Sequence, residues 1–188
     1  MEAATALGHV TMVPDHDGTT RWEALIFEFN GFYYASLGVE AARLALGLDP
    51  GTVLLDFGRT LSVGPIDIPT DPRNRMLINW AGPPATFRTV SAKDLLAGKV
   101  SDAAIRDRIV FIGTSAAGTY DLRVTPMSPV LPGVEKHATV TATILQRRFL
   151  QRPDWVELVE AAGIVLWALL PTWVLPRFRP VASLGLVA

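Results

Sequence analysis

An uncharged apolar segment near the carboxyl end constrains this chain more than any other feature. Residues 161–175 carry no charged side chain, and the longer stretch 156–176 would form a helix about 31 Å long. The hydrocarbon core of a bilayer is about 30 Å thick, so a helix of this length reaches across it. Tryptophans lie toward both of its ends, as is typical of membrane-spanning helices: Trp155, Trp167 and Trp173. We therefore predict a transmembrane helix over residues 156–176.

A buried carboxyl-terminal helix of a soluble domain is the alternative for this segment. The uncharged run is short for a spanning helix, and Pro171 lies inside it. The segment shows no polar stripe, however, and proline is tolerated in transmembrane helices, so the spanning helix is favoured.

The basic residues that follow the segment predict its orientation. Lys and Arg are enriched in cytoplasmic loops, which places Arg177 and Arg179 inside the cell. Residues 177–180 are then a cytoplasmic turn, and residues 181–188 are apolar enough to begin a second transmembrane helix. Residues 1–155 would lie on the outer side of the membrane.

The amino-terminal end shows no means of export for such an external domain. The first ten residues contain no basic region and no long apolar run, so no secretory signal peptide is visible. We therefore expect the chain to be a fragment that is cut at both ends.

The composition supports a division into two parts. The mean hydropathy is +0.30 although 19% of the 188 residues are charged, and the apolar tail accounts for this combination. Seventeen Lys and Arg residues balance eighteen Asp and Glu residues, so no basic surface for nucleic acid is predicted. The absence of cysteine excludes disulfides, thiolate nucleophiles and cysteine-based zinc sites.

The outer part alternates between segments of strand and helix character. Apolar and aromatic runs predict strands, turns are expected at 14–18 and at Asn30–Gly31, and a capping pattern begins at Ser91. The run 109–112 is apolar throughout and predicts a strand buried in the middle of a sheet. The predicted fold class is α/β, a mixed sheet with flanking helices. The remaining strands are expected at 9–13, 22–30, 52–57 and 76–81, and the helices at 35–48 and 133–149.

Helical spacing also predicts which residues of the two long helices lie on one face. In the segment 35–48 the expected line is Leu37, Ala41, Leu44 and Leu48. In the segment 133–149 it is Val134, Ala138, Thr141, Leu145 and Arg148.

The segment after the apolar run 109–112 is the most informative for function. It continues into a loop of small residues whose backbone amides are able to approach an anion closely. Ligands of α/β proteins usually bind where a central strand ends, so the polar residues that follow are the candidate ligand site. The candidates are Gly113, Thr114, Ser115, Asp121, Arg123, Glu135 and His137.

Structural roles are the alternatives for each of these residues. The small-residue loop is explained equally well by tight packing, and no Lys-Ser/Thr pair follows Gly118, so it is not a nucleotide-binding P-loop. Asp121 and Arg123 are expected to form an internal ion pair, and His137 fits a half-buried, hydrogen-bonded histidine. Ser115 and His137, with Asp121, are the one trio that suggests a membrane-anchored hydrolase.

No metal site and no cofactor is predicted. The acidic residues near His9 and His16 belong to the turn Pro14–Gly18, which already requires its Asp and Gly residues.

The string IVFIGTSAAGTYDLRVTPMSPVLPGVEKHA, residues 109–138, resembles the CHASE type-2 family of extracellular sensory domains. Residues 77–91 and the hairpin segment 8–21 are similar to that family too, and the resemblance covers about residues 8–155. The matching positions in the string are Gly113, Asp121, Arg123, Thr125, Pro126, Pro132, Gly133, Glu135 and His137. Lys136 and Thr139 depart from the family pattern, which has an apolar residue and an amide there.

The resemblance implies a bacterial, extracytoplasmic α/β sensor without enzymatic activity of its own. It also implies that a membrane anchor and a first α/β half normally precede this region. The output domain would lie beyond the membrane and be an adenylate or guanylate cyclase, a diguanylate cyclase, or a histidine or Ser/Thr kinase. We expect a homodimer that responds to a small molecule or another environmental signal. A purely structural dimerisation module is the other alternative.

Overall fold

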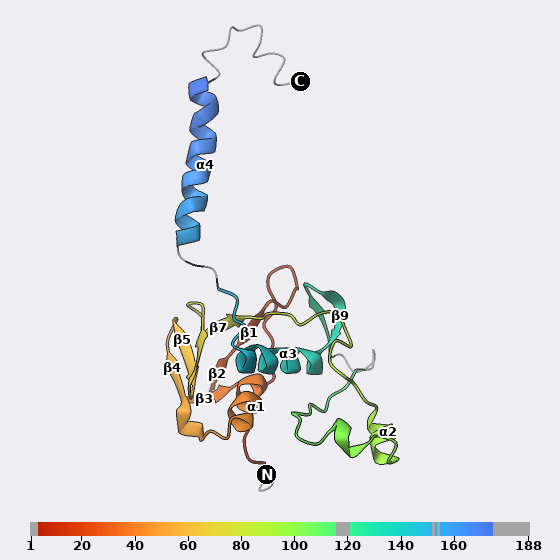
Figure 1. Cartoon of the computed structure of the whole chain (residues 1–188). Helices are drawn as coiled ribbons and strands as arrows, with labels where there is room; N and C mark the ends of the chain where they lie inside the picture. Colours follow the sequence, from red (N-terminus) through yellow and green to blue (C-terminus); the bar gives the residue numbers. More distant parts are fainter. Residues whose placement is uncertain (1–3, 116–120, 152, 154, 175–188) are drawn as a thin grey trace. The chain divides into compact units, whose positions relative to one another are not determined.

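The computed structural model describes residues 4–115, 121–151, 153 and 155–174 (Figure 1). The chain divides into two units, residues 1–150 and residues 151–188, and each is described by itself. The α/β class is confirmed, with the strands arranged in small antiparallel sheets. The strands of the first unit are β1 (Trp22–Ala24), β2 (Ile26–Phe29), β3 (Phe32–Ala35), β4 (Val53–Asp56), β5 (Thr60–Val63), β6 (Ile66–Pro69), β7 (Arg75–Leu77), β8 (Leu122–Thr125) and β9 (Ser128–Pro132).

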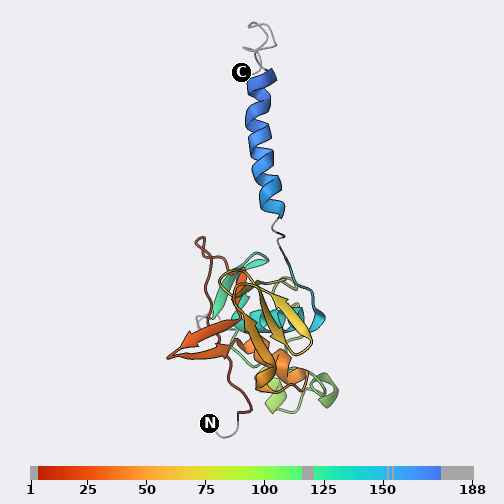
Figure 2. The same ribbon diagram turned by 90° about the vertical axis from the view of Figure 1, so that its left-hand side faces the viewer.

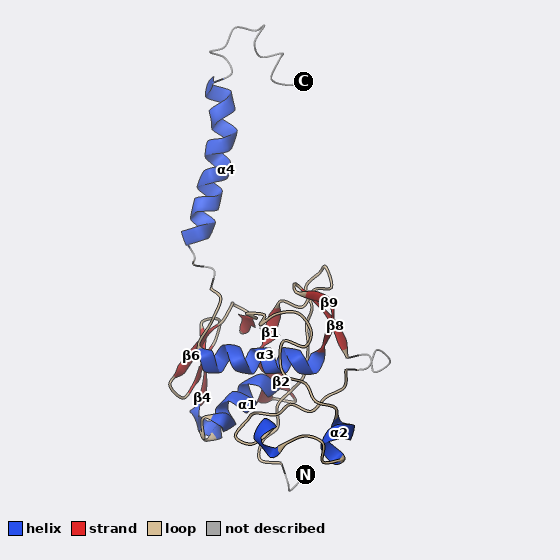
Figure 3. Ribbon diagram, turned by 45° about the vertical axis from the view of Figure 1, so that its right-hand side comes forward, coloured by secondary structure: helices blue, strands red, loops and turns tan. Residues whose placement is uncertain are grey.

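The first unit has two long helices, α1 (Leu37–Ala45) and α3 (Gly133–Gln146), which pack on its core. They lie side by side (Figure 3). The short helical segments are η1 (Pro50–Thr52), α2 (Ala92–Leu96) and η2 (Asp102–Ala104). The buried apolar core joins β3, β5, β6, β7, α1 and α3.

The turn at Asn30–Gly31 is confirmed and creates the β2–β3 hairpin. Both residues have positive φ, 53° and 78°, which is the combination that a type I′ hairpin turn requires. Figure 2 shows this hairpin projecting from the rest of the unit. Its aromatic side chains are largely exposed to solvent: Phe27, Phe29, Phe32, Tyr33 and Tyr34.

The predicted hairpin between 9–13 and 22–30 is wrong. The turn itself forms, because the Gly18 amide donates to the Asp15 carbonyl at 2.9 Å, but residues 10–13 are not a strand. The run 22–30 is divided at Leu25, which is fully buried. Strand β1 pairs with β7 and strand β2 pairs with β3. An apolar run alternates in the same way whichever partner it has, so the pattern did not identify β7.

Two strands that were not predicted, β5 and β6, complete a three-stranded meander with β4. Residues 64–75 contain three prolines, Pro65, Pro69 and Pro72, which argue against a strand in the middle of a sheet. Pro65 lies in the two-residue turn beside Gly64, whose φ is 55°, and Pro69 ends the edge strand β6. These are positions where proline removes no central ladder hydrogen bond. The inward side chains of the two strands are buried: Leu61, Val63, Ile66 and Ile68.

Helix α1 forms where predicted but buries another face. Ser36 is its N-cap and accepts a hydrogen bond from the Val39 amide, and the buried residues are Gly38, Val39, Ala42 and Arg43. Of the predicted line, Leu44 is largely exposed. The reason is the close approach of α3, since a Cβ atom on Gly38 would lie 2.9 Å from the Cβ atom of Val140. Small residues allow this approach, so they decide the buried face.

Helix α3 also forms where predicted, and it ends at Gln146, with Arg147 in the left-handed conformation as its C-cap. Of the predicted line of side chains, Thr141 is buried, whereas the face that packs on the core carries Val140 and Ile144. Helix α2 begins after Ser91, but the Ser91 side chain makes no capping bond there.

The predicted buried strand at 109–112 is wrong. This segment is not a strand, and Ile109, Val110 and Ile112 are exposed by 45%, 51% and 90%. A strand needs the backbone groups of a neighbour, and within the described residues none of the nine strands pairs with this segment. An apolar run shows a preference for burial without supplying that neighbour.

The second unit contains α4 (Trp155–Val174). Its window Trp155–Thr172 has a mean hydropathy of 1.5, and it is the one helix in the described part of the chain that is long and apolar enough to cross a membrane. The predictions for Arg177, Arg179, the turn 177–180 and the second helix at 181–188 lie outside the described residues.

Candidate functional site

The amino-terminal end of α3 brings several predicted site residues together. The Gly133 amide donates to the Asp121 carbonyl at 2.8 Å, and a Cβ atom on Gly133 would lie 2.7 Å from the Asp121 carboxyl carbon. The Asp121 carboxylate therefore lies against the first turn of α3, where the helix dipole favours a negative charge. Arg123 Nη2 lies 3.3 Å from Asp121 Oδ1, which confirms the predicted ion pair.

The small-residue loop reaches the same end of α3 through Gly113. A Cβ atom on Gly113 would lie 2.7 Å from the Val134 Cβ atom, so a larger residue there would push the loop away from the helix. Thr114 and Ser115 are exposed beside this contact. The continuation of the loop, residues 116–120, lies outside the described residues. The described part of the loop is thus consistent with tight packing and leaves two hydroxyl groups accessible.

Glu135 makes a structural contact of its own. Its two carboxylate oxygens accept hydrogen bonds from the Ala85 amide at 3.0 and 3.1 Å. Ala85 has a φ of 66°, a left-handed conformation that is uncommon for alanine. The Glu135 carboxylate therefore holds the strained turn before α2 against α3.

His137 does not join the exposed residues. Its side chain is buried, and its Nδ1 atom has no hydrogen-bond partner. Burial, with the nearby charges of Lys136 and His9, lowers the pKa of His137 to about 3. In the described part of the chain no hydrogen bond joins His137 to Ser115, and the Asp121 carboxylate is engaged by Arg123. The residues of the hydrolase alternative are therefore not arranged as a nucleophile and its base.

A buried ion pair that the sequence analysis did not predict lies behind this end of α3. Lys136 Nζ is 2.6 Å from Glu23 Oε2, and both side chains are 1% exposed. The pair joins α3 to the middle of β1. Burial raises the pKa of the Glu23 carboxyl, and the Lys136 ammonium opposes that rise. The departure of Lys136 from the expected apolar residue was the one signal of this pair in the sequence.

His9 belongs to the same polar interior. Its backbone forms a parallel bridge beside Ser36, with the His9 amide donating to the Ala35 carbonyl at 2.9 Å. Both ring nitrogens are buried without a hydrogen-bond partner. Burial, followed by the charge of Lys136, lowers the pKa of His9 to about 4.

The acidic residues of the turn 14–18 are engaged by an arginine. Arg21 Nη1 lies 2.9 Å from Asp15 Oδ2, and Arg21 Nη2 lies 2.7 Å from Asp17 Oδ2. The hydrogen bonds from Arg21 to Asp17 lower the pKa of the Asp17 carboxyl. Among the residues that the structure describes, no group of His, Asp and Glu side chains has the arrangement of a metal site.

These features define a class of protein. A small α/β unit whose polar residues are engaged in internal contacts is followed in the chain by a helix that is long and apolar enough to cross a membrane. The CHASE2 domain matches the chain over residues 1–173, a range that includes most of α4. The chain belongs to the CHASE2 family, whose members are extracellular sensory domains and act as non-catalytic input modules. No curated protein and no solved structure matches the chain.

Proposed function

We propose that this chain is the signal-input part of a bacterial membrane receptor, with α4 as its transmembrane helix. The unit that contains residues 1–150 would lie outside the membrane and regulate a cytoplasmic cyclase or kinase. The arrangement of α3 carries the proposal. Its first turn carries Glu135 and contacts Asp121, and eight residues separate its end from the start of α4.

Contacts along α3 connect it to several other elements of the first unit. Lys136 binds Glu23 on β1, and the Thr141 hydroxyl donates to the Gly38 carbonyl of α1 at 3.1 Å. Near its end, the Asn79 side chain donates to the Arg148 carbonyl at 2.9 Å. A signal that favours one arrangement of the loop 113–115 and Asp121 over another would therefore act on α3, and through it on the segment that leads to α4.

The proposed location is tested by single cysteine substitutions, because the chain contains no cysteine of its own. Ser101 is exposed in the first unit, and Arg179 follows α4. In intact cells, a membrane-impermeant maleimide should label Ser101→Cys and leave Arg179→Cys unlabelled until the cells are opened. Labelling of Arg179→Cys in intact cells, or protection of Ser101→Cys there, would contradict the proposed orientation.

Signal transmission is tested by disulfide crosslinking between copies of the full chain in membranes. Single cysteines at successive positions of 156–162 should crosslink with a period of about 3.5 residues if two α4 helices pair in a homodimer. We expect Asp121→Asn to shift the positions or the rates of crosslinking, because it weakens the ion pair at the start of α3. Asp102→Asn is the matched control, since Asp102 is exposed and lies 3.5 Å from Arg106.

The outcomes separate the proposal from its alternative. A pattern that changes with Asp121→Asn and not with Asp102→Asn supports transmission from α3 to α4. A periodic pattern that neither substitution changes favours a purely structural dimerisation module. No crosslinking at any position contradicts the homodimer.

A further inference from the structure

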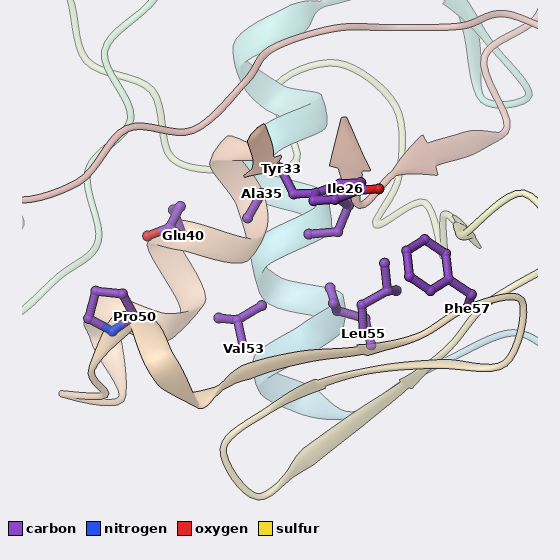
Figure 4. Close-up of a pocket in the computed structure, with 9 residues that line it drawn as sticks. Ile26, Tyr33, Ala35, Glu40, Pro50, Val53, Leu55 and Phe57 are labelled. Carbon is purple, nitrogen blue, oxygen red and sulfur yellow. The ribbon is translucent and has the colours of Figure 1, made fainter. Parts of the chain in front are cut away.

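A second candidate site shares no residue with the group around Asp121 and Glu135. It is a pocket of about 330 Å³ between the β2–β3 hairpin, the start of α1 and the strands β4 and β5 (Figure 4). Its volume falls at the lower end of the range for small-molecule sites, about 300–1,000 Å³. A cavity of about 150 Å³ holds benzene, so this pocket has room for a molecule of one or two rings.

The floor and one wall of the pocket are apolar. Leu61 and Ala35 form the floor and belong to the buried core. Val53 and Leu55 form the wall, because β4 turns these two side chains inward and its alternate residues, Leu54 and Asp56, outward. An apolar guest would therefore be covered by side chains that are already fixed by the core.

Two aromatic side chains stand at the mouth of the pocket. Tyr33 of the hairpin and Phe57 after β4 are both more than half exposed. Their ring centroids are 6.2 Å apart, with the planes at 70°, an edge-to-face arrangement. Because aromatic rings prefer this geometry, a flat guest that enters beside the pair gains contacts of the same kind with either ring. Solvent exposure of these rings would fall on binding.

Glu40 supplies the polar contact at one end, opposite Phe57 (Figure 4). Its Oε2 atom accepts both hydrogen bonds from Arg43, at 2.9 and 2.6 Å, and Arg43 is almost fully buried. The arginine balances the charge of the carboxylate, so the pocket does not require a cationic guest. A carboxylate has about four acceptor sites and Arg43 occupies two of them, so Glu40 retains the capacity to accept a bond from a hydroxyl or N–H group.

We propose that this pocket binds a small, neutral aromatic molecule that carries one hydroxyl or N–H donor, and that this molecule is a signal for the domain. The inference rests on the proposed sensory function and names the ligand class for it. Helix α1 forms one side of the pocket and packs directly against α3 at Gly38 and Val140. Binding that draws the hairpin toward α1 would therefore reach the helix that leads to α4.

Indole is a suitable probe, and 1-methylindole, which lacks the N–H donor, is its matched control. Binding is measured on the full chain in lipid nanodiscs by the NMR shifts of labelled Ile, Leu and Val methyl groups, corrected with empty nanodiscs. We expect saturable shifts for Ile26, Leu55 and Leu61. A hydrogen bond to Glu40 should make indole bind about tenfold more tightly than 1-methylindole.

Two substitutions on β4 separate the pocket from the surface around it. Val53→Phe places a ring in the pocket and should weaken indole binding at least tenfold, whereas Leu54→Phe adds the same ring on the outward side and should leave it unchanged. If Val53→Phe fails to fold, the methyl shifts of the native chain decide the location. Shifts confined to residues outside the pocket, equal binding to Val53→Phe, or no saturable shift with indole overturns the proposal.

The failure of this proposal is distinguishable from failure of the sensory function. If indole does not bind but Asp121→Asn still changes the crosslinking of α4, the ligand class is wrong and the transmission pathway stands. If indole binds and crosslinking never responds, the pocket exists without the proposed link to α4.

Discussion

Removing one partner of the buried pair Glu23–Lys136 should lower the free energy of unfolding by about 3–5 kcal/mol, because the other charge is left buried without a partner. Glu23→Gln leaves the Lys136 ammonium next to a neutral amide. Lys136→Met leaves the Glu23 carboxylate in the same interior. Burial raises the pKa of the Glu23 carboxyl, and Lys136→Met removes the ammonium that opposes this rise.

The double variant Glu23→Leu/Lys136→Met is the informative comparison. Replacing a whole buried pair by apolar residues of similar size is often neutral or stabilising. The free energy of unfolding of the double variant should therefore fall by no more than about 1 kcal/mol. Arg106→Gln is the surface control, because the exposed Asp102–Arg106 pair should contribute less than about 1 kcal/mol. Urea unfolding of the full chain in detergent micelles, followed by the fluorescence of Trp22 and Trp80, measures all four variants. Single variants that unfold like the native chain would contradict a desolvated ion pair.

Acidification should destabilise the first unit before its ordinary carboxylates titrate. The folded-state pKa values of His9 and His137, about 4 and about 3, lie below the usual value of 6.5. The unfolded chain therefore binds more protons between pH 6.5 and pH 4. Stability is full above pH 6.5 and falls as the pH decreases below it, by at most about 1.4 kcal/mol per pH unit for each histidine. The contribution of His9 should level off at a higher pH than that of His137, because its folded-state pKa, about 4, is less lowered.

The measurement is the free energy of unfolding at a series of pH values from 7.5 to 5. His137→Gln should make the free energy of unfolding depend less on pH. His16→Gln, in the exposed turn, should leave that dependence unchanged. Proton uptake by Glu23 acts in the opposite direction, since its raised pKa favours the folded state as the pH falls. The pH series is therefore repeated with the double variant of Glu23 and Lys136. Stability that is constant from pH 7.5 to 5 in both backgrounds would contradict the burial of His137.

The helices and the tight turn could be predicted from the sequence because each is encoded locally. Ser36 lies just before a helical pattern, and Asn30–Gly31 is the preferred pair for a type I′ turn. The helical period predicts a helix over 133–149, of which α3 forms Gly133–Gln146. Pairing could not be predicted in the same way. Strand β1 fits an antiparallel partner anywhere in the chain, and its true partner β7 lies 50 residues further on. Strands β5 and β6 could not be predicted, because Pro65 and Pro69 suggest a connection unless their places, in the turn and at the end of an edge strand, are known.

The candidate site was predicted in part for the same reason. Asp121 and Arg123 are two residues apart, so their ion pair follows from proximity in the chain. Gly113 and Glu135 lie near the start of α3 as expected. The contact of Gly113 with Val134 and that of Glu135 with Ala85 could not be predicted from the sequence. His137 was expected to be half-buried and hydrogen-bonded. It is buried, and its Nδ1 atom has no partner.

The sequence by itself determined an apolar helix, predicted over 156–176 and found as α4 (Trp155–Val174), the α/β class and the family. These depend on composition, on local periodicity and on a continuous string of residues. The tertiary structure decided which face of α1 is buried, that the apolar run 109–112 is not a strand, and that Lys136 meets Glu23. A side chain 113 positions away in the chain supplies the charge that makes a buried lysine stable. Such a pairing depends on how the backbone brings β1 and α3 together, and local sequence patterns do not encode contacts between residues so far apart in the chain.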